Sequence, residues 1–143
     1  MPYQNILVAC DWSEASHTLM QRASEFQHYQ QATVHLIHVV ELAPMLESSF
    51  GPLVSVELDL HERMMQAARQ RLNDLAKPLN IPTERQNVVA GSPKNEIIRL
   101  ARELSAELIL IGSHGRHGVG ALLGSTATSV IHHAPCDVLA IRL

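Results

Sequence analysis

Aromatic residues, long apolar runs and clustered basic residues are all scarce in this sequence. Each shortage argues against a particular kind of core, ligand or location. Aromatic side chains make up 3% of the 143 residues, so we expect an aliphatic core. The formal net charge is -3 and the Lys and Arg residues are scattered, which argues against nucleic-acid binding, since that needs a basic stripe. No apolar run approaches the roughly 20 residues of a membrane span. We therefore expect one globular domain, residues 1–143, that binds neither nucleic acid nor membrane.

Only two cysteines are present, Cys10 and Cys136, and each stands beside an apolar run. Neither has a CxxC partner, so a structural zinc site has no support. The N-terminal residues lead directly into an apolar run without a basic segment or cleavage site, which argues against secretion. We expect a cytoplasmic protein whose thiols behave as small buried hydrophobic groups rather than as a disulfide.

Several enzyme motifs are missing as well. A Walker pattern is absent near the C-terminal glycines, since no lysine follows Lys94, and there is no GxSxG segment. Gly118, Gly120 and Gly124 resemble GxGxxG only loosely and follow the fourth predicted strand instead of the first, so a nicotinamide site is not expected. Among the nine histidines, His132 and His133 are adjacent on a predicted helix and face different directions, and His114 and His117 lack carboxylate or cysteine partners at ligand spacing. No dedicated metal site is therefore predicted.

Strand and helix patterns alternate along the whole chain. Short aliphatic runs predict strands over residues 6–9, 33–40, 88–90, 108–111 and 138–141. Apolar residues at helical spacing predict helices over residues 15–30, 61–79, 93–104 and 125–133. The segment Glu41–Ser55 has no clean period and is predicted to be a loop. Because the strands are continuous aliphatic runs, both faces of the sheet should be covered, which predicts a doubly wound, mostly parallel α/β fold.

The most specific feature is the glycine-rich segment between the last two predicted strands. It begins at Gly112, contains three further glycines, and reaches Gly124-Ser125-Thr126, where a helix is predicted to start. Glycines allow close approach of the backbone to a ligand, and a helix start offers free N–H groups and a favourable dipole. Such an arrangement is typical of an anion site, usually one for phosphate.

Three segments should meet at the carboxyl edge of the sheet, where open parallel sheets bind ligands. Asp11 can accept hydrogen bonds from ribose hydroxyls, and the main chain of Val39 can pair with an adenine edge. His114 and Arg116 can bring positive charge to phosphates. Two plainer interpretations stay open: Asp11 is only a helix cap, with Glu14 in a capping box, and the glycines are only turn residues. The candidate ligand-binding residues are Asp11, Val39, Gly112, His114, Gly115, Arg116, Gly124, Ser125 and Thr126.

Four collinear parts of the chain closely resemble the universal stress protein family. They are Ile6–Ser13, Leu36–Val40, Gly91–Ile98, and a last part made of Gly112–Gly118, Leu122–Ala127 and His132–Arg142. The resemblance covers essentially the whole length. It implies a five-stranded parallel open sheet with helices on both faces, a Rossmann-like three-layer fold of the adenine nucleotide alpha hydrolase-like type. It also implies a cytoplasmic stress-response protein and a homodimer formed by the last strands, Asp137–Leu143, whose unprotected edge invites pairing.

The family contains nucleotide binders and non-binders, and binders resemble Gly-x2-Gly-x9-Gly-Ser/Thr. Here Gly112-x2-Gly115 is followed by only eight residues before Gly124-Ser125, so the loop is one residue shorter. If the glycines absorb this deletion, the resemblance implies binding of AMP, or of ATP with Mg²⁺, with Asp11 and Val39 at the ribose and adenine positions. If the deletion tilts the helix start away from the phosphates, the site is lost.

Three functions follow from these observations. The first is a nucleotide-binding regulator of the stress response without committed catalysis. The second is a nucleotide-free dimeric interaction module, with the Glu41–Ser55 segment as a surface for an unidentified protein partner. The third is an enzyme with slow ATPase or phosphotransfer activity, because phosphoryl transfer needs little covalent chemistry from the protein. The sequence shows no residue that is identifiable as a water-positioning base.

Overall fold

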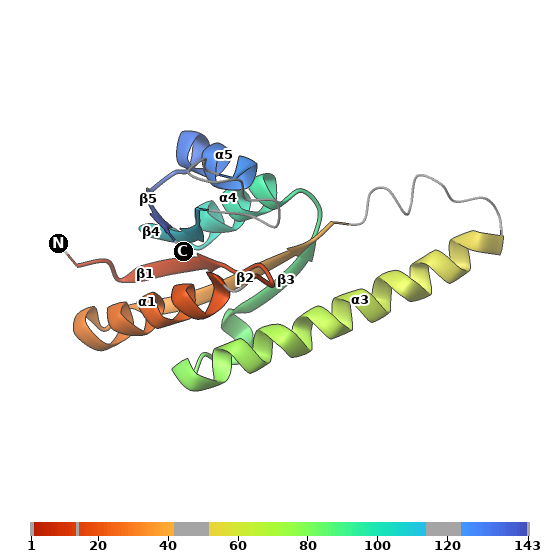
Figure 1. Ribbon diagram of the computed structural model, residues 1–143, viewed down its shortest axis with the longest axis horizontal. Helices are drawn as coiled ribbons and strands as arrows, with labels where there is room; N and C mark the ends of the chain where they lie inside the picture. The colour runs from red at the N-terminus through yellow and green to blue at the C-terminus, as the bar shows by residue number, and fades with distance from the viewer. Residues whose placement is uncertain (1, 14, 42–51, 114–123, 143) are drawn as a thin grey trace.

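A parallel sheet with the strand order β3-β2-β1-β4-β5 forms the centre of the molecule. The computed structural model describes residues 2–13, 15–41, 52–113 and 124–142 (Figure 1). The strands are β1 (Asn5–Ala9), β2 (Thr33–Val40), β3 (Gln86–Ala90), β4 (Leu108–Gly112) and β5 (Asp137–Ile141). The helices are α1 (Ala15–Gln30), α3 (Pro52–Ala76), α4 (Pro93–Glu103) and α5 (Ser125–His133), with short 3₁₀ turns η1 (Lys77–Leu79) and η2 (Thr83–Arg85). All four strand pairs are parallel, so the predicted α/β architecture is confirmed.

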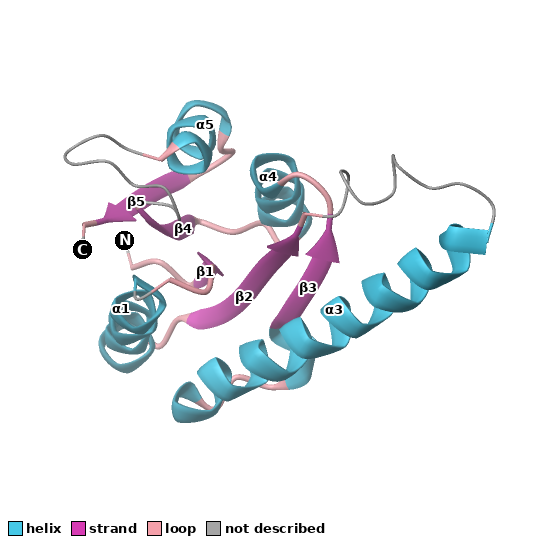
Figure 2. Ribbon diagram, turned by 45° about the vertical axis from the view of Figure 1, so that its right-hand side comes forward, coloured by secondary structure: helices cyan, strands magenta, loops and turns pink. Residues whose placement is uncertain are grey.

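Alternation along each strand divides most of the core into two large hydrophobic clusters, one on each face of the sheet, and a third, small cluster contains Val40, Met65 and Ala68. In β1, Ile6 and Val8 belong to the cluster packed by α1 and α3, whereas Leu7 and Ala9 belong to the cluster packed by α4 and α5. Figure 2 shows these two pairs of helices on opposite sides of the sheet. Both faces are therefore covered, which explains why the strands are continuous aliphatic runs.

The core is aliphatic, as predicted from the shortage of aromatic residues. The largest fully buried side chains are Ile6, Leu7, Leu19, Leu36, Ile37, Leu72, Ile109, Leu110, Val8, Val34 and Val130. The aromatic side chains of Tyr3, Trp12 and Phe26 are only partly buried and pack against the rim of the α1–α3 cluster.

The predicted loop over Glu41–Ser55 is wrong at its C-terminal end, because α3 already begins at Pro52. Proline is well suited to the first position of a helix, where its missing N–H has no helical partner to lose and its φ is already helical. The remainder of that predicted loop, residues 42–51, lies outside the described residues. The amino-terminal half of α3 extends past the sheet (Figure 1). None of the helices in the described ranges is long and apolar enough to cross a membrane.

The turn from β3 into α4 follows the prediction that Ser92 precedes the helix and Pro93 is its first residue. Gly91 in this turn has a φ of +147°, and its N–H donates to the carbonyl oxygen of Val40 at 3.0 Å. The turn is thereby tied to the end of β2.

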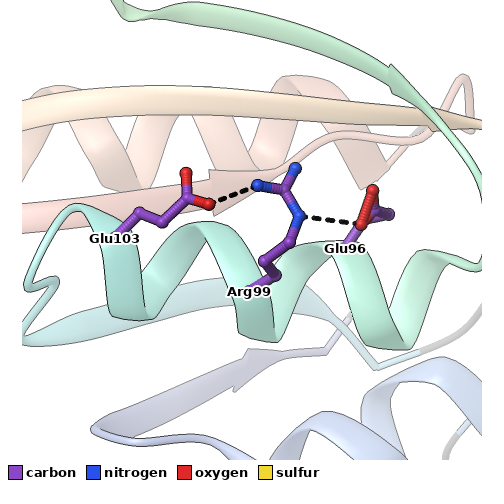
Figure 3. A network of polar contacts seen from close by, with 3 residues as sticks. All are labelled: Glu96, Arg99 and Glu103. Atoms are coloured by element: carbon purple, nitrogen blue, oxygen red, sulfur yellow. Dashed lines mark hydrogen bonds and ion pairs between the residues drawn. The ribbon is translucent and has the colours of Figure 1, made fainter.

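Further along α4, the guanidinium of Arg99 forms ion pairs with Glu96 at 3.0 Å and with Glu103 at 2.5 Å (Figure 3).

Candidate functional site

The direction of the strand order reverses between β1 and β4, which are neighbours in the sheet. From β1 the chain proceeds through β2 to β3 on one side, and it later returns to β4 and β5 on the other. In open parallel sheets the crevice beyond the carboxyl ends of two such strands is the usual ligand site. The segments that reach this point are the turn after β1, which carries Asp11, and the residues after β4, which lead to the start of α5.

Asp11 is the second residue after the end of β1 and is half-buried. Its Oδ1 accepts hydrogen bonds from the main-chain N–H of Ser13 at 3.0 Å and from the Ser13 hydroxyl, while its main-chain oxygen accepts from the hydroxyl of Ser16. The carboxylate therefore shapes the turn that precedes α1; because α1 begins at Ala15 and Ser13 lies before it, this is not the helix cap that the plainer interpretation expects. Among the described residues, the hydrogen bonds to this carboxylate involve Oδ1 alone, so Asp11 keeps acceptor capacity for a ligand. Glu14, the second member of the predicted capping box, lies outside the described residues.

Val39 and Asp11 lie on neighbouring segments, β2 and the turn after β1, at the carboxyl edge of the sheet. The N–H of Cys10 donates to the carbonyl oxygen of Ile37 at 2.8 Å, which extends the pairing of β1 with β2 by one residue. Val39 pairs in register with Val89 of β3, and its half-buried side chain packs on the α4–α5 cluster. The topology thus brings these two predicted site residues together.

The start of α5 is held close to the ends of β4 and β5. The N–H of Gly124 donates to the carbonyl oxygen of Ser113 at 2.8 Å, and the N–H of Ser113 donates to that of Ile141 at 2.9 Å. Gly124 is the N-cap and provides no side-chain cap, and the first hydrogen bond within the helix comes from Thr128. The N–H groups of the first three helical residues therefore have no helical partner, and Ser125 is exposed while Thr126 is half-buried.

Ser113 is a site residue that the sequence reasoning missed. It is buried, with 6% of its surface exposed, and its hydroxyl has no hydrogen-bond partner among the described residues. Its position in the sequence could have identified it, because Ser113 is the polar residue that immediately follows β4. Buried hydroxyls are normally satisfied, and this one belongs to a residue whose main chain bonds to Gly124 at the start of α5, so Ser113 is a candidate donor for an oxyanion at this edge.

The other predicted site residues divide into two groups. Gly112, the last residue of β4, is half-buried and pairs with Ile141, so it lies at the same edge. His114, Gly115 and Arg116 lie outside the described residues, and their predicted roles stay predictions. Within the described part of the chain, no group of three His, Cys, Asp or Glu side chains is placed to hold a metal ion.

A second group of side chains supports the Asp11 turn from the α1–α3 face of the sheet. The indole of Trp12 stacks on the imidazole of His38, with ring centroids 3.9 Å apart and planes inclined by 26°. The guanidinium of Arg71, from α3, lies over the same indole at 4.4 Å. Beside them is an open cleft of about 310 Å³ lined by Trp12, Ser13, Ser16, His17, Arg71, Asp74 and Leu75.

Neither cysteine is suited to nucleophilic chemistry. Both are free thiols; Cys10 is buried in the α1–α3 cluster and Cys136 is half-buried. Burial, with a smaller contribution from Asp11, raises the pKa of the Cys10 thiol to about 12. Burial also raises the pKa of Cys136. Both thiols are protonated at neutral pH, and the prediction that Cys10 acts as a small hydrophobic residue is confirmed.

Comparison with known proteins agrees with this architecture. A sequence model of the Universal stress protein family matches residues 2–142. The chain is 37% identical to universal stress protein A homolog 1 of Coxiella burnetii, covering 99% of this chain and 97% of that protein. The solved structure of UspA from Lactobacillus plantarum matches with a TM-score of 0.72 at 28% identity over 99% of each chain. A universal stress protein crystallised in complex with cAMP matches with a TM-score of 0.67 at 24% identity, covering 99% of this chain and 98% of that one. With a family match along nearly its whole length and a relative that shares 37% of its residues, the chain belongs to the Universal stress protein family.

Proposed function

We propose that this protein binds an adenine nucleotide, AMP or ATP with Mg²⁺, and acts as a cytoplasmic regulator of the stress response without committed catalysis. Membership of the Universal stress protein family supports the role in the stress response. In this proposal Asp11 binds the ribose and the main chain of Val39 binds the adenine. The phosphates bind to Gly112, His114, Gly115, Arg116, Gly124, Ser125 and Thr126.

The observation that carries the proposal is the start of α5. Three main-chain N–H groups there have no helical partners, and the neighbouring Gly124 N–H bonds to the main chain of Ser113, a residue whose buried hydroxyl has no partner among the described residues. A helix start concentrates positive potential, so these donors favour a negatively charged ligand. The cAMP complex of a structurally similar family member supports the adenine nucleotide as that ligand.

The shortened glycine loop is compatible with this site. In the described residues α5 begins at Ser125, at the position that the pattern of the nucleotide binders requires. The hydrogen bond from the Gly124 N–H to Ser113 ties the helix start to the end of β4. These two facts support the interpretation in which the deletion is absorbed within the loop and the helix start keeps its place.

The chemistry of the described site favours binding over reaction. It supplies hydrogen-bond donors for an anion and one carboxylate, Asp11, whose Oδ1 is already engaged by Ser13. The buried Cys10 thiol has its pKa raised to about 12, so it is not a nucleophile at neutral pH. Regulation by the bound nucleotide therefore stands ahead of slow ATPase or phosphotransfer activity in our proposal.

The proposal is tested by the nucleotide content of the purified protein. The protein is purified without added nucleotide and denatured, and the supernatant is chromatographed; we expect AMP or ATP in near-stoichiometric amount. In parallel, the affinity for Mg-ATP and for AMP is measured by calorimetry. Absence of nucleotide, together with no measurable binding, would favour the nucleotide-free interaction module instead.

A single substitution at the helix start makes the test specific. Ser125→Glu places a negative charge where the phosphates are proposed to bind, and we expect it to lower the affinity at least tenfold by charge repulsion. The same charge is favourable for the helix dipole, so the folded state should not be weakened. Ser24→Glu, on the exposed face of α1, is the matched control and should bind as the wild type does. Equal affinities for the two variants would contradict the proposed phosphate position.

A further inference from the structure

His38 is a buried polar side chain near the end of the inner strand β2, with 5% of its surface exposed. Its Nδ1–H donates to the main-chain oxygen of Cys10 at 2.8 Å. Cys10 is the residue immediately before Asp11, so this hydrogen bond acts on the turn that carries the proposed ribose contact. The other positions on the same face of β2 are the apolar Val34, Leu36 and Val40.

The Cys10 carbonyl lies where the pairing between β1 and β2 ends. The N–H of Cys10 still bonds to Ile37, but β1 itself stops at Ala9. Cys10 is buried, so its carbonyl is shielded from bulk water, and an unpaired buried carbonyl costs the full loss of its hydration. The imidazole supplies the donor that the sheet no longer supplies, and thereby fixes the direction of the chain as it leaves the strand.

The same imidazole also contacts Trp12, which lies two residues after Cys10 in this turn. Trp12 stacks on it at 3.9 Å, and Arg71 lies over the indole, so a column of three side chains connects β2 and α3 through the turn. Asp11 therefore lies between two residues, Cys10 and Trp12, that both contact His38. A ligand contact on such a turn is presented in one orientation, which lowers the cost of ordering it on binding.

We propose that His38 is a positioning residue for nucleotide binding: by fixing Cys10 and Trp12 it holds the Asp11 carboxylate in the orientation that receives the ribose. This inference rests on the proposed function and extends it to a residue that reaches the ligand only through the turn. A turn that samples other conformations is competent to bind only part of the time, so the apparent dissociation constant rises in proportion.

The test uses two substitutions that separate the hydrogen bond from the ring. His38→Phe keeps a planar ring against Trp12 but removes the donor, whereas His38→Asn keeps an amide donor near the position of Nδ1 and removes the ring. His35→Phe is the matched control, because His35 is half-buried in the same strand but packs on the opposite face and contacts Asn5, at the start of β1. Each variant is first shown to be folded by circular dichroism, and its dissociation constant for ATP is then measured.

We expect His38→Phe to raise the dissociation constant about tenfold, the loss typical of one buried hydrogen bond, with His38→Asn recovering much of it and His35→Phe near the wild type. Unchanged affinity in His38→Phe, an equal loss in His35→Phe, or no recovery in His38→Asn would overturn the positioning role.

A measurement without ligand separates this inference from the proposed function. Amide hydrogen exchange is followed for the peptide that contains Asp11–Ser16, and Trp12, the single tryptophan of the chain, reports on the same turn by its fluorescence. If the wild type binds no nucleotide, the proposed function fails. The amide exchange rates of this peptide then test by themselves whether His38 fixes the turn. Faster exchange in this peptide for His38→Phe but not for His35→Phe supports a role in fixing the turn, and equal rates overturn it.

Discussion

At the scale of single residues, buried polar side chains near the carboxyl edge of the sheet serve main-chain groups. His38 donates to the carbonyl of Cys10, and Ser16 donates to that of Asp11. Both acceptors lie where β1 has ended and α1 has not begun, so no regular ladder satisfies them. Ser113 differs, because its buried hydroxyl has no partner among the described residues, and it is the residue that a ligand at this edge would satisfy.

Gly91 is predicted to be irreplaceable for reasons of backbone conformation. Its φ of +147° is strained for any residue with a side chain, and an added Cβ would lie 3.2 Å from Cγ of Glu96. We expect Gly91→Ala to lower the free energy of unfolding by about 1–3 kcal/mol, measured by urea denaturation. The double variant Gly91→Ala with Glu96→Ala removes the contact but not the strain, so it should remain destabilised. Full recovery in the double variant would show that the contact, and not φ, is the cause.

His35 is predicted to make stability depend on pH. Burial, and secondarily the charge of Arg85, lower the pKa of His35 below its ordinary value of 6.5. As the pH falls through 6.5, the unfolded chain takes up this proton before the folded protein does, so stability declines until the pH is below the folded pKa. His35→Gln keeps a donor for Asn5 but does not titrate.

The measurement is the free energy of unfolding by urea at several values between about pH 7.5 and about pH 5, for the wild type and His35→Gln. The wild type should lose more stability than the variant over this interval, although the other histidines contribute equally to both. Parallel curves for the two proteins would contradict the lowered pKa.

At the scale of elements, β5 is one of the two edge strands of the described sheet, and β3 is the other. Strand β5 lies at the end of the sheet beside β4 alone, and Leu139 on this strand is 40% exposed. An unprotected edge can pair with a second copy, and we propose that the homodimer forms there through Asp137–Leu143. Val138 and Ala140, which the sequence suggested as positions for charged substitutions, pack on the α4–α5 cluster, so Leu139 is the better position to change.

We expect Leu139→Lys to convert dimers into monomers in sedimentation experiments, because a charge at the interface must be desolvated on pairing. Leu58→Lys is the matched control, since Leu58 is also exposed, at 55%, but belongs to α3. This control should sediment as the wild type does. An unchanged mass for Leu139→Lys, with an intact circular dichroism spectrum, would defeat pairing through β5.

At the scale of the whole molecule, the two hydrophobic clusters share one sheet and should unfold together. Ile109 and Leu110 are adjacent in β4 and fully buried, but they belong to different clusters. We expect either residue changed to Ala to lower the free energy of unfolding by about 2–5 kcal/mol through the cavity it leaves. Trp12 reports on the α1–α3 face, so its fluorescence and circular dichroism should give coincident transitions for both variants. Separate midpoints for Ile109→Ala would mean that the two layers unfold independently.

Much of the architecture could be predicted from local pattern. Continuous aliphatic runs such as residues 33–40 can only be strands covered on both faces, and apolar residues at helical spacing gave α1, α4 and α5 within a residue or two. The start of α3 was missed because its first turns have no clean apolar period, although a proline such as Pro52 is favourable at the first helical position. Proline occurs both just after the end of a helix and at the first position of a helix, and the residues around Pro52 did not show which of these roles it has.

The sequence by itself determined the alternation of strands and helices, the aliphatic core and the family, because each depends on residue type and spacing along the chain. Only the tertiary structure decided that His38 contacts Cys10 and Trp12, and that the main chain of Ser113 bonds to Gly124 at the start of α5. These contacts join residues that are distant in sequence, and they depend on strand order, register and the direction in which each side chain leaves the sheet. The pairing of strands that are distant in sequence is a property of the folded chain, so it cannot be predicted from a local sequence pattern.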